Sequence, residues 1–120
     1  MTSDPVATNP GLYRVLFEND RVRVLGYLDA PGDATAPHSH PDSVMITLSG
    51  FDRRLVSGSE ERIVHLEPET VAWLPAQEHS GENIGETPTR VIFVELKEPT
   101  PNEPAPVTDI GPADQPNVNA

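Results

Sequence analysis

Residues 32–50 read GDATAPHSHPDSVMITLSG, and this stretch carries the pattern that decides the fold. His38 and His40 lie two positions apart between two prolines. In an extended segment alternate side chains share one face, so both imidazoles can reach a single ion. A His-x-His pair alone is a weak signal, because two histidines in a proline-rich loop are often only polar surface. The residues around the pair therefore decide its meaning.

Alternating strands are predicted on both sides of this stretch. Apolar residues recur with period two in short runs separated by turn residues, which is typical of half-buried strands, and no run indicates a helix. A set of short strands without helices to cover a parallel sheet predicts an all-β sandwich or barrel. The runs are residues 12–17, 21–28, 44–48, 53–56, 62–66, 70–74 and 89–96.

The length of 120 residues predicts one domain. We expect a flexible N-terminal segment over residues 1–10 and a barrel over residues 11–97. Residues 98–120 hold six of the 14 prolines, several acidic residues and no Lys, Arg or aromatic residue. Such a segment buries too little apolar surface to offset the entropy cost of ordering, so we predict a largely disordered acidic tail.

Charge and composition exclude several classes of function. Asp and Glu total 19 against 8 Lys and Arg, a formal net charge of −11. This balance argues against nucleic-acid and anionic-membrane partners. The absence of cysteine excludes disulfides and thiolate metal sites. Residues 1–5 do not resemble a signal peptide, and no apolar run approaches the ~20 residues that span a bilayer, so a cytoplasmic location is expected.

A third histidine completes a candidate metal site. His79 lies in the segment PAQEHSGEN, residues 75–83, on the connection after the run that ends near Leu74. Together with His38 and His40 it forms a set of three nitrogen ligands. Neutral imidazoles suit one divalent ion of Fe, Zn, Ni, Mn, Co or Cu and leave positions open for water or substrate. The fourth histidine, His65, is predicted to face outward between Val64 and Leu66.

The two histidine segments resemble the two motifs of the cupin superfamily. The resemblance spans about residues 12–96 and implies a small single-domain cupin with a double-stranded β-helix, or jelly-roll, barrel. It further implies a metal in the lumen, a small-molecule ligand and frequently a homodimer. The matching residues are Gly32, His38, His40 and Gly50 in the first motif, and Pro75, His79 and Asn83 in the second.

The chain departs from the family pattern at the fourth ligand. Ser43 stands where the motif has a metal-binding glutamate. Asp42 could supply an oxygen instead, although a turn residue after Pro41 is the favoured interpretation. Ser43 is a poor metal ligand, so hydrogen bonding is its expected role. Asn83 could orient a ligand or form a turn, and both alternatives stay open.

Arginines and aromatic residues on the predicted strands can face the lumen or the solvent. Arg53 and Arg54 are adjacent on a predicted strand, so one faces each side, and the inward one could bind an anionic substrate. Alternatively the strand is an edge, or twists enough for both charged groups to reach solvent. Arg23 and Arg90 are predicted to face solvent. Tyr27 and Trp73 could line the pocket, but core or interface packing is the favoured interpretation.

Three functional hypotheses remain at this stage. The first is a metal-dependent enzyme, of dioxygenase or lyase/isomerase type, acting on a small oxygenated molecule. The second is a non-catalytic metal or small-molecule binding module, and the third is a barrel without metal. No catalytic residue can be assigned, and a proton donor or acceptor positioned in the lumen would discriminate the first two hypotheses.

Overall fold

The computed structural model describes residues 4–97, which form one short helix and nine strands. The tail predicted over residues 98–120 lies outside the described residues. The elements are α1 (Pro5–Thr8), β1 (Tyr13–Glu18), β2 (Val22–Asp29), β3 (His38–His40), β4 (Ser43–Thr47), β5 (Phe51–Ser57), β6 (Glu60–Leu66), β7 (Val71–Leu74), β8 (Gln77–Asn83) and β9 (Thr89–Leu96).

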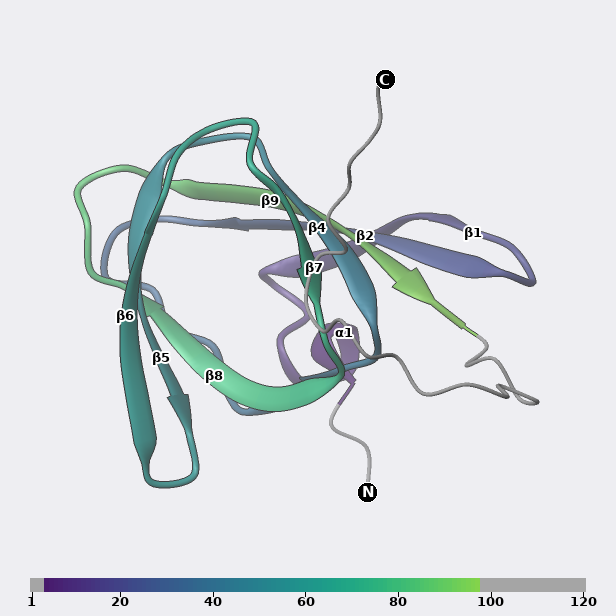
Figure 1. The fold of residues 1–120 in the computed structure, drawn as a ribbon, viewed down its shortest axis with the longest axis horizontal. Coiled ribbons are helices and arrows are strands. Elements are labelled where there is room, and N and C mark those ends of the chain that lie inside the picture. The colour runs from purple at the N-terminus through teal and green to yellow at the C-terminus, as the bar shows by residue number, and fades with distance from the viewer. Residues whose placement is uncertain (1–3, 98–120) are drawn as a thin grey trace.

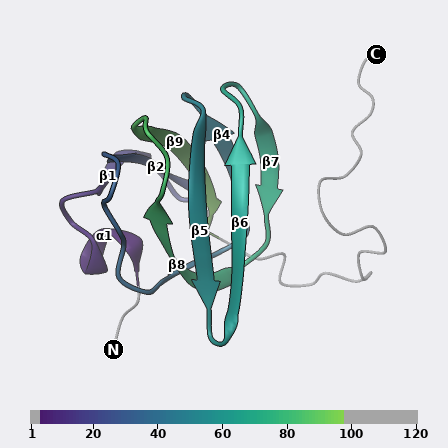
Figure 2. The same ribbon diagram turned by 90° about the vertical axis from the view of Figure 1, so that its left-hand side faces the viewer.

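The strands form two antiparallel sheets that face each other across a lumen (Figure 1). The larger sheet has the order β1-β2-β9-β4-β7 and the smaller one β3-β8-β5-β6. In the view turned by 90°, the β5–β6 hairpin lies in front of β4 and β7 (Figure 2). The predicted all-β jelly roll is confirmed. Among residues 4–97 no ladder joins the two sheets, so the strands do not form one continuous ring.

Alternation of buried and more exposed side chains, strict along β9, separates an inner from an outer face. On β9 the side chains of Val91, Phe93 and Glu95 are buried, whereas Arg90 is exposed. Residues paired directly across an antiparallel ladder point to the same side, so the register carries this face from strand to strand. The inner faces form the core, which comprises Tyr13, Leu25, Tyr27, Phe51, Val91 and Phe93.

One end of the lumen is held by a buried ion pair. Nη1 of Arg53 lies 2.7 Å from Oδ2 of Asp29. Tyr27 donates its hydroxyl proton to the same carboxylate, and Asn83 donates its amide to Oδ1 at 3.0 Å. Arg53 is therefore the inward arginine of the pair, and its charge is balanced within the fold. Asn83 supports this ion pair, a role that the sequence did not indicate.

Gly81 permits the close approach of the Arg53 side chain. A Cβ atom at position 81 would lie 2.9 Å from Nη2 of Arg53, too close for an ordinary contact. The outward neighbour, Arg54, instead bonds to Glu61 and Glu82 near the surface. The strand thus directs its two arginines to opposite faces of the sheet, as period-two geometry requires.

Residues 4–9 form a capped helical turn, which corrects the prediction that the chain has no helix. Oδ2 of Asp4 accepts hydrogen bonds from the backbone N–H groups of Val6 and Ala7, as expected of an N-cap. The Asn9 side chain accepts from the Ala36 N–H at 2.8 Å and donates to the Ala36 carbonyl at 3.3 Å. This contact ties the N-terminal segment to the chain just before β3.

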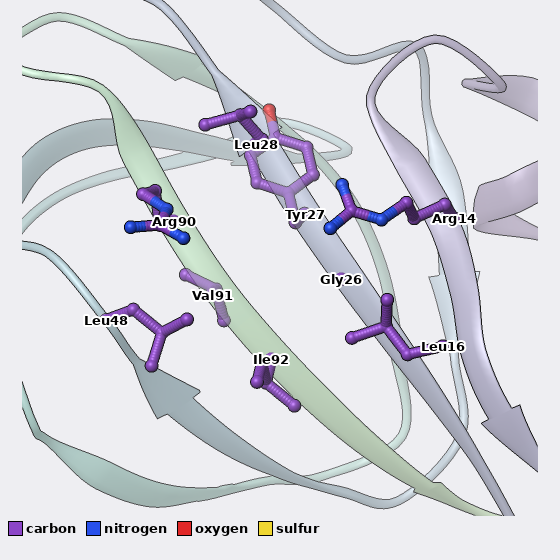
Figure 3. A pocket seen from close by; sticks show the side chains of 9 residues that line it. All are labelled: Arg14, Leu16, Gly26, Tyr27, Leu28, Leu48, Arg90, Val91 and Ile92. Carbon is purple, nitrogen blue, oxygen red and sulfur yellow. The ribbon is translucent and has the colours of Figure 1, made fainter.

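The outer face of the larger sheet carries a shallow hollow of about 140 Å³ (Figure 3). Arg14 and Arg90 border it, from β1 and β9, and aliphatic side chains such as Leu48 and Ile92 line it. The prediction that Arg90 faces solvent is confirmed. No helix within residues 4–97 is long and apolar enough to span a membrane.

Core packing on β2 can be tested with two leucines of the same strand. Leu25 is completely buried, whereas Leu28 is 46% exposed on the outer face. We expect Leu25→Ala to lower the free energy of unfolding by about 2–5 kcal/mol, because it removes buried methyl groups and leaves a cavity. Leu28→Ala is expected to cost less than about 1 kcal/mol. Urea unfolding curves measure both, and equal losses would contradict the assigned faces.

Candidate metal centre

The register between β3 and β8 brings the histidines together. His38 pairs directly with His79, and His40 follows two positions later on the same face of β3. The possible ligand atoms of the three rings all lie within 4.8 Å of one another. The prediction that His79 lies on a connection is wrong, because it belongs to β8. The convergence itself follows from strand pairing rather than from a loop.

Each ring has an oxygen acceptor at its Nδ1 atom. His38 Nδ1 lies 2.8 Å from the Ala36 carbonyl, and His79 Nδ1 lies 2.7 Å from Oε1 of Gln77. His40 Nδ1 lies 3.3 Å from Oε2 of Glu95. These oxygens accept hydrogen bonds, so in the neutral rings Nδ1 carries the proton and Nε2 keeps its lone pair. Three such Nε2 atoms are the donor set that a borderline divalent ion requires.

Glu95 is the site residue that sequence reasoning missed. It is 3% exposed and bridges His40 to Arg23, whose Nη2 lies 3.0 Å from Oε1 of Glu95. Arg23 also bonds to Asp4, so the prediction that it faces solvent is wrong. The signal was present in the alternation of β9, where Glu95 falls on the inward face after Val91 and Phe93. An acidic residue at an inward strand position indicates a buried partner.

Neither residue considered as a fourth ligand is directed at the histidines. The Asp42 carboxylate accepts a hydrogen bond from the Ala76 N–H at 2.9 Å, in agreement with its turn interpretation. Ser43 is fully buried and donates its hydroxyl to the Pro41 carbonyl at 2.7 Å. Its direct cross-strand neighbour on β9 is Glu95. The carboxylate therefore reaches the histidines from β9 and binds Nδ1 of His40.

Tyr13 places a hydroxyl at the open side of the histidine cluster. Its oxygen lies 3.2 Å from Nε2 of His38 and 3.4 Å from Nε2 of His40. Because these nitrogens are acceptors, the hydroxyl is the donor. Burial raises the pKa of Tyr13, which keeps the proton on the phenol at neutral pH. The ring packs against Tyr27 with centroids 4.6 Å apart, which holds the hydroxyl in place.

Burial also keeps two of the histidines neutral. It lowers the pKa of His79 to about 3, with the nearby His40 and His38 rings acting in the same direction. Burial likewise lowers the pKa of His38, against the hydrogen bond to Ala36. Neutral rings are the metal-binding form, so His38 and His79 need no deprotonation at pH 7. His65 lies far from this environment, exposed and bonded to Asp52 and Glu67, as predicted.

A cavity of about 460 Å³ opens from the histidines into the lumen. His38, His79 and Tyr13 line one part of it, and Trp73 and Phe93 contribute aromatic surface. Trp73 is half-buried and lies outside the core cluster of residues 4–97, so it serves as a wall residue of the cavity. The volume falls in the range of small-molecule sites. The arrangement can hold an ion at one place and a ligand of moderate size beside it.

The sequence matches no protein-family model and no curated protein. Among solved structures, a cupin domain from Bordetella pertussis is 24% identical with a TM-score of 0.68, over 72% of this chain and 93% of that chain. A protein with a double-stranded β-helix domain from Klebsiella pneumoniae is 25% identical, with a TM-score of 0.57, over 72% and 77%.

The polyketide cyclase RemF from Streptomyces resistomycificus is 22% identical with a TM-score of 0.56. The alignment covers 72% of this chain and 64% of RemF. Likenesses at these identities concern the fold and not the reaction.

The lowered pKa of the half-buried His79 predicts an acid-sensitive fold when metal is removed. Unfolded histidine titrates near 6.5, but folded His79 binds a proton only near pH 3. The unfolded chain therefore binds more protons between these values, and stability falls as pH falls through this window. The loss reaches up to about 1.4 kcal/mol per pH unit for each such histidine. Urea unfolding of chelator-treated protein between pH 7 and pH 4.5 measures it.

His79→Gln should flatten this pH dependence, whereas His65→Gln should not. The pKa of His65 is raised by its bonds to Glu67 and Asp52, so any contribution from it has the opposite sign. An unchanged slope in His79→Gln would contradict the assignment of a buried neutral ring.

The role of Glu95 predicts a weaker site when its charge is removed. In Glu95→Gln the acceptor for His40 Nδ1 loses its charge, and we expect the affinity for zinc to fall about 10- to 100-fold. Competition with a chromophoric chelator measures the affinity. Glu82→Gln, which removes a partner of Arg54 on the outer face, serves as the matched control and should leave zinc affinity unchanged. Equal affinities in all three proteins would contradict the role of Glu95.

Proposed function

This chain has the double-stranded β-helix fold of small cupin-domain proteins, and from that premise we propose that it is a metal-dependent enzyme. It binds one divalent ion through His38, His40 and His79 and acts on a small oxygenated molecule in the lumen. The single observation that carries the proposal is the convergence of three imidazole rings, whose possible ligand atoms lie within 4.8 Å of one another and whose Nδ1 atoms each face an oxygen acceptor. The donor set fits Fe, Zn, Ni, Mn, Co or Cu.

Tyr13 favours an enzyme over a passive binding module. An enzyme of this type requires a proton donor or acceptor within reach of the reacting atoms. The Tyr13 hydroxyl touches Nε2 of both His38 and His40, so it borders the position that an ion and its bound ligand would share. It can donate a hydrogen bond to a substrate oxygen as negative charge develops there. The bound ion would supply Lewis-acid chemistry and, if iron, redox chemistry.

A non-catalytic binding module remains the second candidate. The buried carboxylates Asp29 and Glu95 are both held in ion pairs with arginines, so neither is a free general base. This arrangement supports binding without turnover. Activity of dioxygenase or of lyase/isomerase type, a cytoplasmic location and a homodimer stay predictions. One structural neighbour is named a polyketide cyclase, and an aromatic substrate would suit the apolar walls of the cavity.

Metal content tests the proposal directly. We expect protein purified without a histidine tag and loaded with zinc or iron to hold close to one ion per chain. His38→Ala and His79→Ala should each remove most of the bound metal, because two remaining imidazoles bind weakly. Elemental analysis after gel filtration gives the ratio, and circular dichroism verifies that the variants are folded.

His65→Ala is the control, since it removes an exposed histidine outside the cluster. Full metal retention in the doubly substituted His38→Ala, His79→Ala protein would overturn the site. If the Tyr13→Phe variant kept its metal but lost the wild-type activity on an oxygenated substrate, the result would support the enzyme over the binding module.

A further inference from the structure

The cavity beside the histidines has an unusual charge distribution for so acidic a chain. None of the acidic residues between positions 4 and 97 lines it, although the sequence contains 19 Asp and Glu. Two of the arginines do line it, namely Arg53 and Arg62. A small acidic protein repels anions over most of its surface, so a cavity that is lined by arginines and by no carboxylate marks a local preference for negative charge.

The two arginines differ in what balances them. Arg53 is paired with Asp29 at 2.7 Å and also bonds to Tyr27 and Thr89. Its charge is therefore neutralised within the fold. Arg62 has no ion pair among residues 4–97, and it is exposed to solvent. The uncompensated positive charge of the cavity is that of Arg62.

The register of β6 directs Arg62 to the lumen. Arg62 shares its face with Val64 and Leu66, which pack toward the core, while His65 points to the outside. Its direct partner on β5 is Leu55, another residue of the cavity wall. Being both exposed and part of the wall, Arg62 lies at the mouth. Its guanidinium can form a bidentate pair with a carboxylate that enters the cavity.

Most of the remaining wall is apolar, with polar groups supplied by Thr35, Thr89 and the tyrosines. Met45, Phe51, Leu55, Trp73, Leu74 and Phe93 supply aliphatic and aromatic surface between Arg62 and the histidines. An apolar body would pack against these walls, and an acidic group would pair with Arg62 at the mouth of the cavity. The cavity volume of about 460 Å³ leaves room for a ring-sized body with a short chain.

We propose that the lumen binds a small anionic amphiphile, with its acidic group on Arg62 and its apolar body along Trp73 and Phe93. This inference rests on the proposed function in one respect, since it names the substrate class for the same cavity. Binding of the acid is nevertheless separable from metal binding, because Arg62 takes no part in the histidine cluster.

The test uses 4-phenylbutyrate, its neutral isostere 4-phenylbutyramide, and butyrate as the acid without the apolar body. Trp73 is the only tryptophan of the chain and lines the cavity, so its fluorescence reports occupancy. Titration calorimetry gives the affinities. We expect phenylbutyrate to bind about tenfold more tightly than either companion, as loss of one charge-assisted pair or of the apolar contact predicts.

Variants locate the charge that is responsible for the tighter binding of phenylbutyrate than of the amide. Arg62→Gln should abolish the preference of phenylbutyrate over the amide, and Arg62→Lys should retain part of it. Arg90→Gln is the matched control, because Arg90 is an exposed arginine on the outer face, in the separate hollow of Figure 3, and should retain the preference in full. Equal binding of acid and amide by the wild type, an undiminished preference in Arg62→Gln, or no saturable binding of either probe would each overturn the proposal.

Titrations of the protein as purified and after chelation separate the two proposals. Binding of phenylbutyrate that survives chelation and depends on Arg62 supports the anion site whatever the metal content. One bound metal per chain, together with equal binding of phenylbutyrate and its amide, would instead support the metal site and refute the anion site.

Discussion

Everything at the candidate site depends on the pairing of β3 with β8, in which His38 lies directly opposite His79. A shift of one residue would turn one ring to the other face of the sheet, since side chains alternate along a strand. The same pairing sets Gln77 opposite His40. Gln77 also lies two residues before His79 on β8, and its amide oxygen accepts a hydrogen bond from the His79 ring. Backbone register thus determines both the meeting of the imidazoles and the orientation of one of them. Glu95, from the opposite sheet, orients His40.

Charge is distributed through the lumen in two separate arrangements. Around the histidines, Glu95 links His40 to Arg23, so the carboxylate is satisfied on both sides. At the other end, Arg53 and Asp29 neutralise each other in the core. Removing Arg23 or Arg53 would leave the buried carboxylate of Glu95 or Asp29 without its arginine, which is destabilising. These pairs stabilise the lumen without contributing net charge to the cavity, and the cavity is left with its apolar walls and a single unbalanced arginine at the mouth.

Much of this fold could be predicted from the sequence, because period-two alternation between turn residues is a direct physical consequence of half-buried strands. The spacing of His38 and His40 also predicted a shared face. Two features could not be obtained in the same way. The strand carrying His79 is rich in polar residues, so β8, like the three-residue β3, lacks the apolar alternation that identified the other seven strands. Arg23 and Glu95 lie 72 positions apart, and only the β2–β9 register shows that they are partners.

In this interpretation the fold orients the three rings before any ion binds. Protein oxygens hold each Nδ1 atom, and Nε2 is left to face the ion. A crystal structure of the metal-loaded protein, with anomalous diffraction data collected at the absorption edge of the metal, tests this most directly. The account predicts one anomalous peak at about 2.0–2.2 Å from Nε2 of His38, His40 and His79. It also predicts that the Nδ1 contacts to Ala36, Glu95 and Gln77 are retained. A peak bound through Nδ1, or located away from these rings, would contradict it.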